Sequence, residues 1–139
     1  MKALVDSSVW SLALRRRAPP ADAAAIELQP LIDHGRVAFI GPIRQEILSG
    51  IRDRAAFVRL RDHLRAFADE RLDADDFELA AEHFTTCRAA GVQASNDDVL
   101  ICAAAHRRAL QILTTDADFR RFAKLLPIAL FASRLASAA

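Results

Sequence analysis

The sequence predicts a single α/β domain over residues 1–139, with three α/β/α layers and a short parallel sheet of about four or five strands. Short apolar segments alternate with longer segments of helical periodicity, which is typical of parallel strands covered on both faces. The length of 139 residues fits one hydrophobic core. Only four glycines occur, which favours helices over a turn-rich all-β fold.

The expected strands are short apolar runs that stop at polar residues or turns. The first run stops at Asp6, and the third is followed by the tripeptide Thr114-Thr115-Asp116. Because the runs are apolar throughout and do not alternate, they indicate strands buried on both faces of a sheet. Strands are expected over residues 3–5, 37–40, 110–113 and 127–131.

The expected helices are recognised by apolar periodicity and by the residues at their ends. Pro42 stands in the first turn of one helix and Gly50 follows its last turn, which is the usual asymmetry of helix ends. Pro30 is expected to kink a helix, Gly91 to end one and Ser95 to cap one. Helices are expected over residues 9–13, 21–33, 42–49, 53–68, 75–90, 95–109 and 118–125.

The charge and cysteine content narrow the class of protein. Nineteen Lys and Arg against eighteen Asp and Glu leave a formal net charge of +1, which argues against nucleic-acid binding by bulk charge but allows a local basic face. Cys87 and Cys102 form no CxxC pair, so buried free thiols in a reducing cytoplasm are expected. No apolar run approaches the roughly 18 residues of a membrane span, and no signal peptide is recognisable. We therefore expect a cytoplasmic domain with no membrane partner.

Two aspartates come directly after predicted strands or within a few residues of them. Asp6 follows the first strand, and Asp116 comes three residues after the third. Because the carboxyl ends of parallel strands share the edge of the sheet where ligands bind in open α/β folds, both are expected at that edge. The alternative for each is an aspartate that caps the next helix. Asp118 has the same two interpretations.

Asp98 lies near the start of a predicted helix and in line with its apolar face. The apolar residues that follow it by 3, 4, 7 and 11 positions are Ile101, Cys102, Ala105 and Ala109. Asp97 is rotated by about 100° and should point away from that face. A carboxylate directed along a buried face is costly unless backbone donors, a cation or a metal offset its charge. The alternative is a capping box, in which Ser95 caps the helix and Asp98 bonds back to it.

Glu46 borders the inward side of its helix, which Ile43 and Ile47 define. The alternative is a surface glutamate paired with Arg44 or another nearby arginine. Clustered carboxylates repel one another and raise one another's pKa unless a cation holds them. No constellation of His and Cys accompanies the carboxylates, and hard oxygen ligands suit Mg²⁺ or Mn²⁺ better than zinc. The candidate carboxylates are Asp6, Glu46, Asp98, Asp116 and Asp118.

Four segments of the chain resemble the motifs of PIN-domain ribonucleases, and especially those of the VapC toxins of bacterial type II toxin–antitoxin pairs. They stand in the order VDSSVW, IRQEILSG, NDDVLICAAA and LTTDADF, between residues 5 and 119. The resemblance implies four catalytic and metal-binding acids, one further metal ligand and two supporting hydroxyl residues. In this sequence they are Asp6, Glu46, Asp98 and Asp116, then Asp118, and then Ser8 and Thr115. Cys102 departs from the family's usual alanine, which is a conservative change.

The resemblance implies that the whole chain is one PIN domain and a metal-dependent endoribonuclease. It implies Mg²⁺, with Mn²⁺ as an alternative, as the metal that assists hydrolysis of an RNA phosphodiester. It also implies a cognate VapB-type antitoxin that neutralises the enzyme, and a toxin homodimer. Arg15, Arg16 and Arg17 follow the first helix close to the expected site. They are candidates for binding RNA phosphates, or for receiving carboxylates of a protein partner.

The same residues argue against two other classes of protein and leave two PIN-like alternatives open. A phosphatase of the haloacid dehalogenase type needs a second aspartate two residues after the first, where this chain has Ser8. A receiver domain needs a lysine after its last strand and an aspartate after a middle strand, and neither is recognisable. A PIN nuclease of RNA processing and a non-catalytic PIN-like module that binds RNA or protein both stay open. Non-catalytic modules commonly lose acids, whereas all the expected acids are present here.

Overall fold

A parallel sheet forms the centre of the protein. The computed structural model describes residues 2–15 and 22–132, and within them the sheet has four strands in the order β2-β1-β3-β4. The strands are β1 (Ala3–Val5), β2 (Val37–Ala38), β3 (Gln111–Leu113) and β4 (Ala129–Leu130). Every residue of β1 is buried, as an uninterrupted apolar run predicts. The expected α/β class and the parallel sheet are therefore confirmed.

Each expected helix is present in the part of the chain that the structure describes. In the described ranges the helices are α1 (Ser7–Arg15), α2 (Ala23–Asp33), α3 (Gly41–Ser49), α4 (Arg54–Leu64), α5 (Ala74–Ala89), α6 (Asn96–Arg107) and α7 (Asp118–Leu125). Asp53 caps α4 by accepting a hydrogen bond from the amide of Ala56, and Ser95 caps α6. Gly91 follows α5 with a φ of 74°, a conformation that glycine adopts without strain.

Two helices end earlier than the sequence predicts. Helix α4 stops at Leu64 instead of residue 68, because the following segment turns to run beside β2, where Phe39 forms a bridge with Asp69. Helix α6 stops at Arg107 instead of residue 109. Ala109 has a φ of 53° and is exposed, so it belongs to the turn into β3 and not to the buried face of α6. At the end of α4 a contact distant in the chain overrides the local periodicity. Helix α6 instead ends in a local turn, in which the amide of Leu110 donates to the carbonyl oxygen of Ala105 at 2.9 Å.

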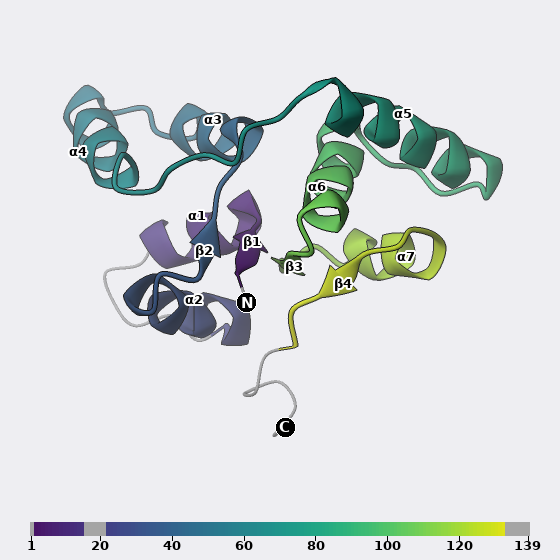
Figure 1. Ribbon diagram of the computed structural model, residues 1–139. Helices are drawn as coiled ribbons and strands as arrows, with labels where there is room; N and C mark the ends of the chain where they lie inside the picture. The colour runs from purple at the N-terminus through teal and green to yellow at the C-terminus, as the bar shows by residue number, and fades with distance from the viewer. Residues whose placement is uncertain (1, 16–21, 133–139) are drawn as a thin grey trace.

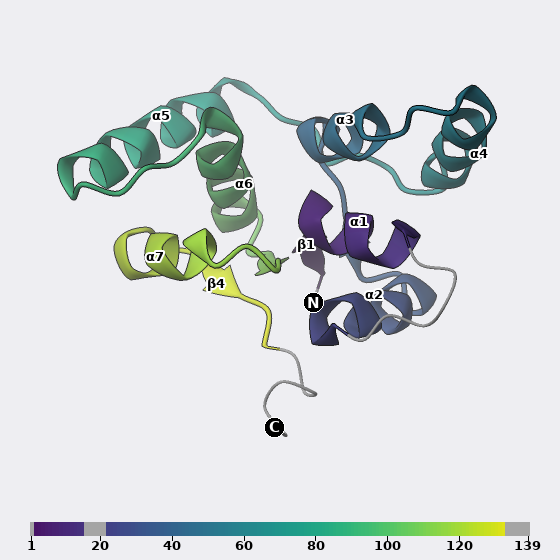
Figure 2. The same ribbon diagram turned by 180° about the vertical axis from the view of Figure 1, so that it is seen from behind.

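Helices cover both faces of the sheet (Figure 1). Helices α1 and α2 lie on one side of the strands, whereas α5, α6 and α7 lie on the other, as the view from behind also shows (Figure 2). The connections explain this arrangement, because β1–α1–α2–β2 and β3–α7–β4 leave the middle of the sheet in opposite directions. Right-handed crossovers then place their helices on opposite faces. The expected three-layer architecture is confirmed.

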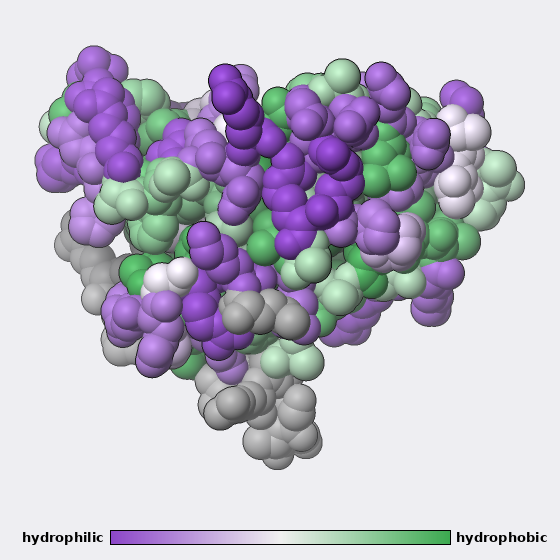
Figure 3. Space-filling model, in the orientation of Figure 1, coloured by the Kyte–Doolittle hydropathy of each residue, from purple (hydrophilic) through white to green (hydrophobic). Residues whose placement is uncertain are grey.

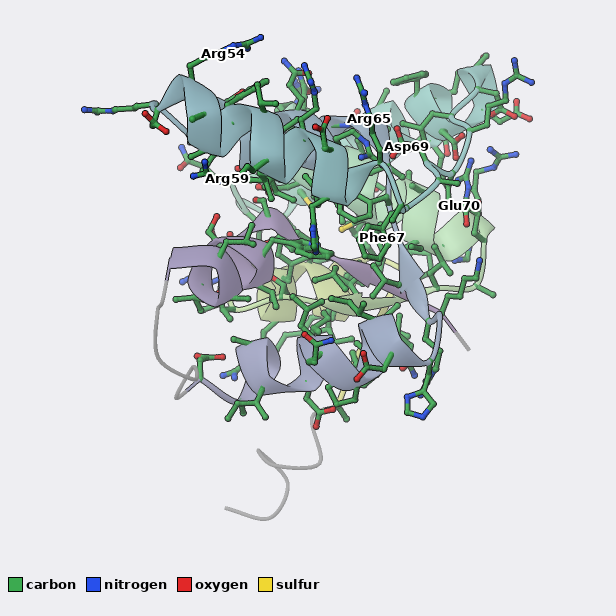
Figure 4. The ribbon with its side chains drawn as sticks, turned by 90° about the vertical axis from the view of Figure 1, so that its left-hand side faces the viewer. Arg54, Arg59, Arg65, Phe67, Asp69 and Glu70 are labelled. Carbon is green, nitrogen blue, oxygen red and sulfur yellow. The ribbon has the colours of Figure 1, made fainter. Side chains whose placement is uncertain are left out.

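An aromatic cluster joins α1 to the segment that follows α4. The ring centroids of Trp10 and Phe39 are 5.1 Å apart, and those of Trp10 and Phe67 are 5.6 Å apart. Figure 4 shows Phe67 turned toward the interior beneath α4, while Arg54 and Arg65 point outward. The guanidinium of Arg44 donates to the carbonyl oxygen of Phe67 at 2.6 Å. These contacts fix the strand-like segment against β2 and make α3 a rigid support at this end of the sheet.

One carboxylate, that of Asp76 near the start of α5, is fully buried. The guanidinium of Arg108 donates to both of its oxygens, at 2.6 and 2.9 Å, and Arg107 lies 2.9 Å from one of them. The hydrogen bonds from Arg108 hold the pKa of Asp76 well below its usual range. This ion pair ties the start of α5 to the end of α6.

The cysteines, the surface and the helix lengths bear on the expectations drawn from composition. Cys87 and Cys102 are buried free thiols, as predicted, and burial raises the pKa of Cys102 to about 12. Hydrophilic side chains dominate the face seen in Figure 3, with only small apolar areas between them. In the part of the chain that the structure describes, we find no helix with the length and hydropathy needed to span a bilayer.

Candidate active site

The site lies where β1 and β3 end side by side. The two strands pair in parallel with Val5 opposite Leu113, and the amide of Asp6 donates to the carbonyl oxygen of Leu113 at 2.9 Å. Asp6 and Thr114 are therefore the first residues beyond two neighbouring strands. Ligands of open parallel sheets bind at this edge.

The carboxylate of Asp6 is 7% exposed and is held by three strong donors. One oxygen accepts from the amide of Ser7 at 2.8 Å. The other accepts from the Ser8 hydroxyl at 2.8 Å and from the Thr114 hydroxyl at 2.9 Å. Ser7 also begins α1, so the positive end of the helix dipole faces the same carboxylate. These contacts hold the side chain of Asp6 in one orientation.

The hydroxyl groups continue the network to the loop after β3. The Ser8 hydroxyl oxygen accepts from the amide of Thr115 at 3.2 Å, and the Thr114 hydroxyl oxygen accepts from the amide of Asp116 at 3.0 Å. Thr115 thus contributes its backbone amide, while its side chain is exposed. Sequence reasoning selected Thr115 and missed Thr114. The signal that could have found it is its position directly after a strand that neighbours β1.

Asp98 combines the two interpretations that the sequence left open. It forms the capping box with Ser95, in which the Ser95 hydroxyl accepts from the amide of Asp98 and the Asp98 carboxylate accepts from the amide of Ser95, each at 3.1 Å. Its side chain is nevertheless half-buried, whereas Asp97 is exposed, as the periodicity predicts. Val99 to Ala105 behind it are all buried. The cap therefore holds the carboxylate at the border of the core instead of releasing it to solvent.

The neighbours of Asp98 are other acids. Burial raises the pKa of Asp98, and the charges of Asp116 and Asp6 raise it further, while the hydrogen bonds with Ser95 lower it. The opposing contributions leave the pKa above its ordinary value. The structure thus brings Asp6, Asp98 and Asp116 close enough to interact electrostatically, although they are far apart in the chain.

Asp116 and Asp118 lie at the start of α7. One oxygen of Asp116 accepts from the amide of Asp118 at 2.9 Å, so Asp116 acts as a local cap as well as an acidic neighbour of Asp98. The carboxylate of Asp118 lies 3.7 Å from the guanidinium of Arg121. Asp118 and Asp98 line a common pocket of about 620 Å³, and Asp116 lines a second one of about 590 Å³.

The structure shows no contact between the other predicted site residues and the carboxylates described above, among the residues it describes. Glu46 is exposed on α3, and no hydrogen bond or ion pair joins it to another described residue. Its proposed alternative partner, Arg44, instead pairs with Asp69 at 2.8 Å. The side chain of Arg15 and all of residues 16 and 17 lie outside the described part of the chain, so the predicted basic cluster Arg15-Arg16-Arg17 has no structural account.

The candidate ligands suit a hard cation by their chemistry, since all of them are carboxylates. Asp6, Asp98 and Asp116 lie close enough together to interact electrostatically. Among the described residues, however, no three acidic, histidine or cysteine side chains converge closely enough to form a complete ligand set. Mg²⁺ does not require one, because it keeps several waters and is commonly held by one or two carboxylates together with substrate phosphates. The residues therefore fit a hydrated Mg²⁺ and not a closed protein cage.

Comparison with known proteins agrees with this architecture. A model of the PIN domain matches residues 3–125. Ribonuclease VapC11 of Mycobacterium tuberculosis and VapC ribonuclease Mb1587 of Mycobacterium bovis are each 33% identical to this chain over 126 residues, which cover 88% of the chain and 92% of the relative.

Two solved structures share the fold. FitAcB from Neisseria gonorrhoeae aligns with a TM-score of 0.75 and 21% sequence identity, over 94% of this chain and 97% of that one. VapBC2 from Rickettsia felis, bound to a DNA fragment from its promoter, aligns with a TM-score of 0.74 and 18% sequence identity, over 94% of this chain and 98% of that one.

Proposed function

The chain belongs to the PIN-domain family, and from that membership we propose that it is a VapC-type ribonuclease toxin that hydrolyses RNA phosphodiester bonds and is neutralised by a VapB-type antitoxin. The observation that carries the catalytic part of the proposal is the raised pKa of Asp98 beside Asp6 and Asp116. Three ionised carboxylates at one edge of the sheet cost free energy, and a cation at that edge removes the cost.

We propose that Asp6, Asp98 and Asp116 hold Mg²⁺ or Mn²⁺, with Glu46 and Asp118 as further acidic groups. Bound there, the metal supplies Lewis-acid chemistry, because it lowers the pKa of water and offsets charge on a phosphoryl group. Asp6 contributes a fixed negative charge, since Ser8 and Thr114 hold its carboxylate in place. Asp98 contributes a carboxylate that retains its proton to higher pH than usual until a cation binds.

The hydroxyl groups around Asp6 are proposed to position the carboxylates and not to take part in the reaction. The Ser8 and Thr114 hydroxyls each join Asp6 to a backbone amide of the loop after β3. We propose that they set the distance between Asp6 and Asp116. Arg15, Arg16 and Arg17 would bind RNA phosphates next to this edge, and charge reversal there should weaken RNA binding and flatten its salt dependence.

The test compares two neighbouring aspartates that differ only in direction. Asp98→Asn should reduce cleavage of an RNA pool by more than about a hundredfold in Mg²⁺, because it removes a group that contacts the metal, whereas second-sphere changes already cost 10–100-fold. Asp97→Asn is the matched control, since it removes the same charge from the exposed side of the same turn. Wild type should lose activity in EDTA and regain it with Mg²⁺ or Mn²⁺.

A second readout does not depend on activity. Mg²⁺ should raise the melting temperature of wild type and of Asp97→Asn, because a ligand that binds only the folded state stabilises it, and this rise should vanish in Asp98→Asn. Equal cleavage by the Asp98→Asn and wild-type proteins, or an equal loss in Asp97→Asn, would contradict the assigned roles.

The partners are tested by co-expression. If the chain is a toxin, its production alone should arrest growth of a host, and co-production of the product of the adjacent reading frame should restore growth. Size-exclusion chromatography of the purified chain, with and without that product, would then show the proposed homodimer and the proposed complex. A chain that cleaves RNA without arresting growth would indicate a PIN nuclease of RNA processing.

A further inference from the structure

A pocket beside the acidic site has the chemistry of a nucleotide-binding surface. It has a volume of about 620 Å³, within the roughly 300–1,000 Å³ of small-molecule sites. Helix α5 contributes Phe84 and Arg88, the loop from Gly91 contributes Gln93, and the carboxylates of Asp98 and Asp118 complete the lining with a few backbone and small side-chain neighbours. Two of the proposed metal-binding acids and a cation–aromatic pair therefore face the same space.

The aromatic wall of the pocket is firmly held. Phe84 is half-buried and packs against the small core cluster that includes Ala80, Val99 and Leu100. The guanidinium carbon of Arg88 lies 5.5 Å from the centre of the Phe84 ring. Arg88 is exposed, and it forms no ion pair with a described carboxylate. Its planar cation is thus positioned on an aromatic ring without a carboxylate to neutralise it.

The opposite wall is a short loop with a defined conformation. Gly91, at a φ of 74°, turns the chain after α5, and the amide of Val92 donates to the carbonyl oxygen of Cys87 at 2.8 Å. Val92 and Ala94 pack inward against the core, whereas Gln93 between them is exposed. Gln93 lines the pocket together with its two neighbours, and it is the one of the three whose side chain carries hydrogen-bond donors and an acceptor.

We propose that this pocket binds one unpaired nucleotide of the RNA substrate, adjacent to the bond that is cut. Its base stacks against the Arg88–Phe84 pair, and the Gln93 amide contacts the edge of the base. Unpaired bases are recognised by stacking on aromatic rings or guanidinium planes and by hydrogen bonds to their edges. The proposal rests on the proposed ribonuclease function and assigns to Arg88 and Gln93 the binding and selection of the nucleotide.

The experiment uses a natural control on another helix. Arg54 lies on α4 in the other half of the molecule, and its guanidinium carbon is 5.4 Å from the ring centre of Phe57 (Figures 1 and 4). Arg88→Ala and Arg54→Ala therefore remove the same charge from the same kind of pair. Binding of a fluorescent single-stranded RNA would be measured by anisotropy with Mg²⁺ in the Asp6→Asn background, which leaves the pocket lining intact while removing the proposed cleavage.

Arg88→Ala should weaken binding by about tenfold, the usual effect of losing one stacked base, and Arg54→Ala by less than about twofold. The difference should persist at high salt, because stacking is less sensitive to screening than bulk attraction. Equal effects of the two variants, an equal effect of Arg88→Ala on fully duplex RNA, or the absence of measurable RNA binding would each overturn the proposal.

Cleavage assays in the otherwise wild-type chain separate the two proposals and test Gln93. Gln93→Ala should reduce the spread of cleavage rates among oligonucleotides that differ only at the nucleotide next to the cut. Cleavage by wild type, with the same KM and the same base preference in Arg88→Ala and Gln93→Ala, would overturn the pocket and leave the ribonuclease standing. Wild type that binds RNA through Arg88 but never cleaves it would overturn the ribonuclease alone.

Discussion

Helices α5 and α6 begin with the same local motif and put it to opposite electrostatic use. Each starts with a capping box that has aspartate at its third position, Asp73 with Asp76 in α5 and Ser95 with Asp98 in α6. In both, the aspartate carboxylate accepts from the backbone amide of the capping residue, at 2.8 Å in α5 and 3.1 Å in α6. Both carboxylates make the same kind of hydrogen bond to the capping residue, although the caps differ in residue type and in φ, which is -130° at Asp73 and -79° at Ser95. The largest difference between the two carboxylates is the charge of the groups beyond the cap.

Asp76 faces cations and Asp98 faces anions. Arg108 and Arg107 contact Asp76 and lower its pKa, whereas burial, Asp116 and Asp6 raise the pKa of Asp98. Asp76 is thus a neutralised structural anchor, and Asp98 is an unneutralised charge at the edge of the sheet. The comparison shows that a capping box does not argue against a functional role, because the same carboxylate can cap a helix with one oxygen and face a binding site with the other.

The largest effect on stability is expected when the buried ion pair of Asp76 is broken. Asp76→Asn should lower the free energy of unfolding by about 3 kcal/mol, since removal of one partner from a buried ion pair leaves the other charge uncompensated. Urea denaturation followed by circular dichroism would measure it. Asp75→Asn is the control on the same turn, because Asp75 is exposed and lies 3.5 Å from Arg107. A loss below about 1 kcal/mol in Asp76→Asn would mean that solvent reaches the arginines after the change.

The second prediction concerns pH, because the contributions of Asp76 and Asp98 to folding stability should change in opposite directions on acidification. The pKa of Asp76 is lowered by folding, so its stabilising contribution is present above the unfolded value of about 3.9 and disappears as the pH falls through the folded pKa. The pKa of Asp98 is raised by folding, so its ionised form costs stability at neutral pH, and that cost disappears as the pH falls through the raised value.

Unfolding curves of wild type and the two Asn variants between about pH 3 and pH 8 would show both effects, in metal-free buffer. Wild type should exceed Asp76→Asn most at neutral pH, and the gap should begin to narrow as the pH falls below the unfolded value of about 3.9. Asp98→Asn should exceed wild type at neutral pH and lose that advantage in acid. Parallel curves for all three proteins would contradict the electrostatic difference.

A smaller effect tests the shared motif itself. Ser95→Ala and Asp73→Ala each remove the side chain that accepts from the third amide of its helix, which costs about 1 kcal/mol. Asp73→Ala should cost slightly more, because its carboxylate also lies 2.9 Å from Arg107. Differential scanning calorimetry would rank the two. If Ser95→Ala also lowers RNA cleavage, the cap positions Asp98 for the reaction.

The smallest effect is a gain. Asp98→Asn should raise the melting temperature in EDTA by a few degrees at most, because it removes repulsion from Asp116 and Asp6 while an Asn oxygen can still accept from Ser95. The same variant should be inactive, so stability and activity move in opposite directions. A fall in melting temperature equal to that of Ser95→Ala would indicate that the cap outweighs the repulsion.

Much of the fold could be predicted from local features. The helix over residues 118–125 has the predicted bounds, and capping residues such as Ser95 stand at the predicted positions, because helix ends depend on nearby side chains and backbone groups. The ends of α4 and α6 were wrong by four and two residues, respectively, at Leu64 and Arg107. After α4 the chain makes a bridge with Phe39, a distant contact that the local periodicity does not contain. After α6 the chain turns locally through Ala109, whose positive φ the apolar periodicity does not reveal.

In the candidate site too, some residues could be located from local sequence pattern and others only from the folded structure. Periodicity correctly separated Asp98 from the exposed Asp97, and the positions after strands located Asp6 and Asp116 at one edge. Thr114 escaped notice because its hydroxyl meets Asp6 across 108 residues of chain. The proposed catalytic and metal-binding roles of all five acids, and the RNA-binding role of the arginines after α1, stay predictions, to be decided by the metal and RNA experiments above.

The amino-acid sequence alone determined the elements of this protein, their parallel α/β class and the list of acids available to a site, because these follow from short-range periodicity, helix ends and strand composition. Only the tertiary structure decided which acid is neutralised and which is not. Arg108 reaches Asp76 across 32 residues, and Asp98 meets acids from β1 and the loop after β3. The interaction between charges depends on their distance in space, so two aspartates in the same type of capping box acquire opposite pKa shifts only when the chain has folded.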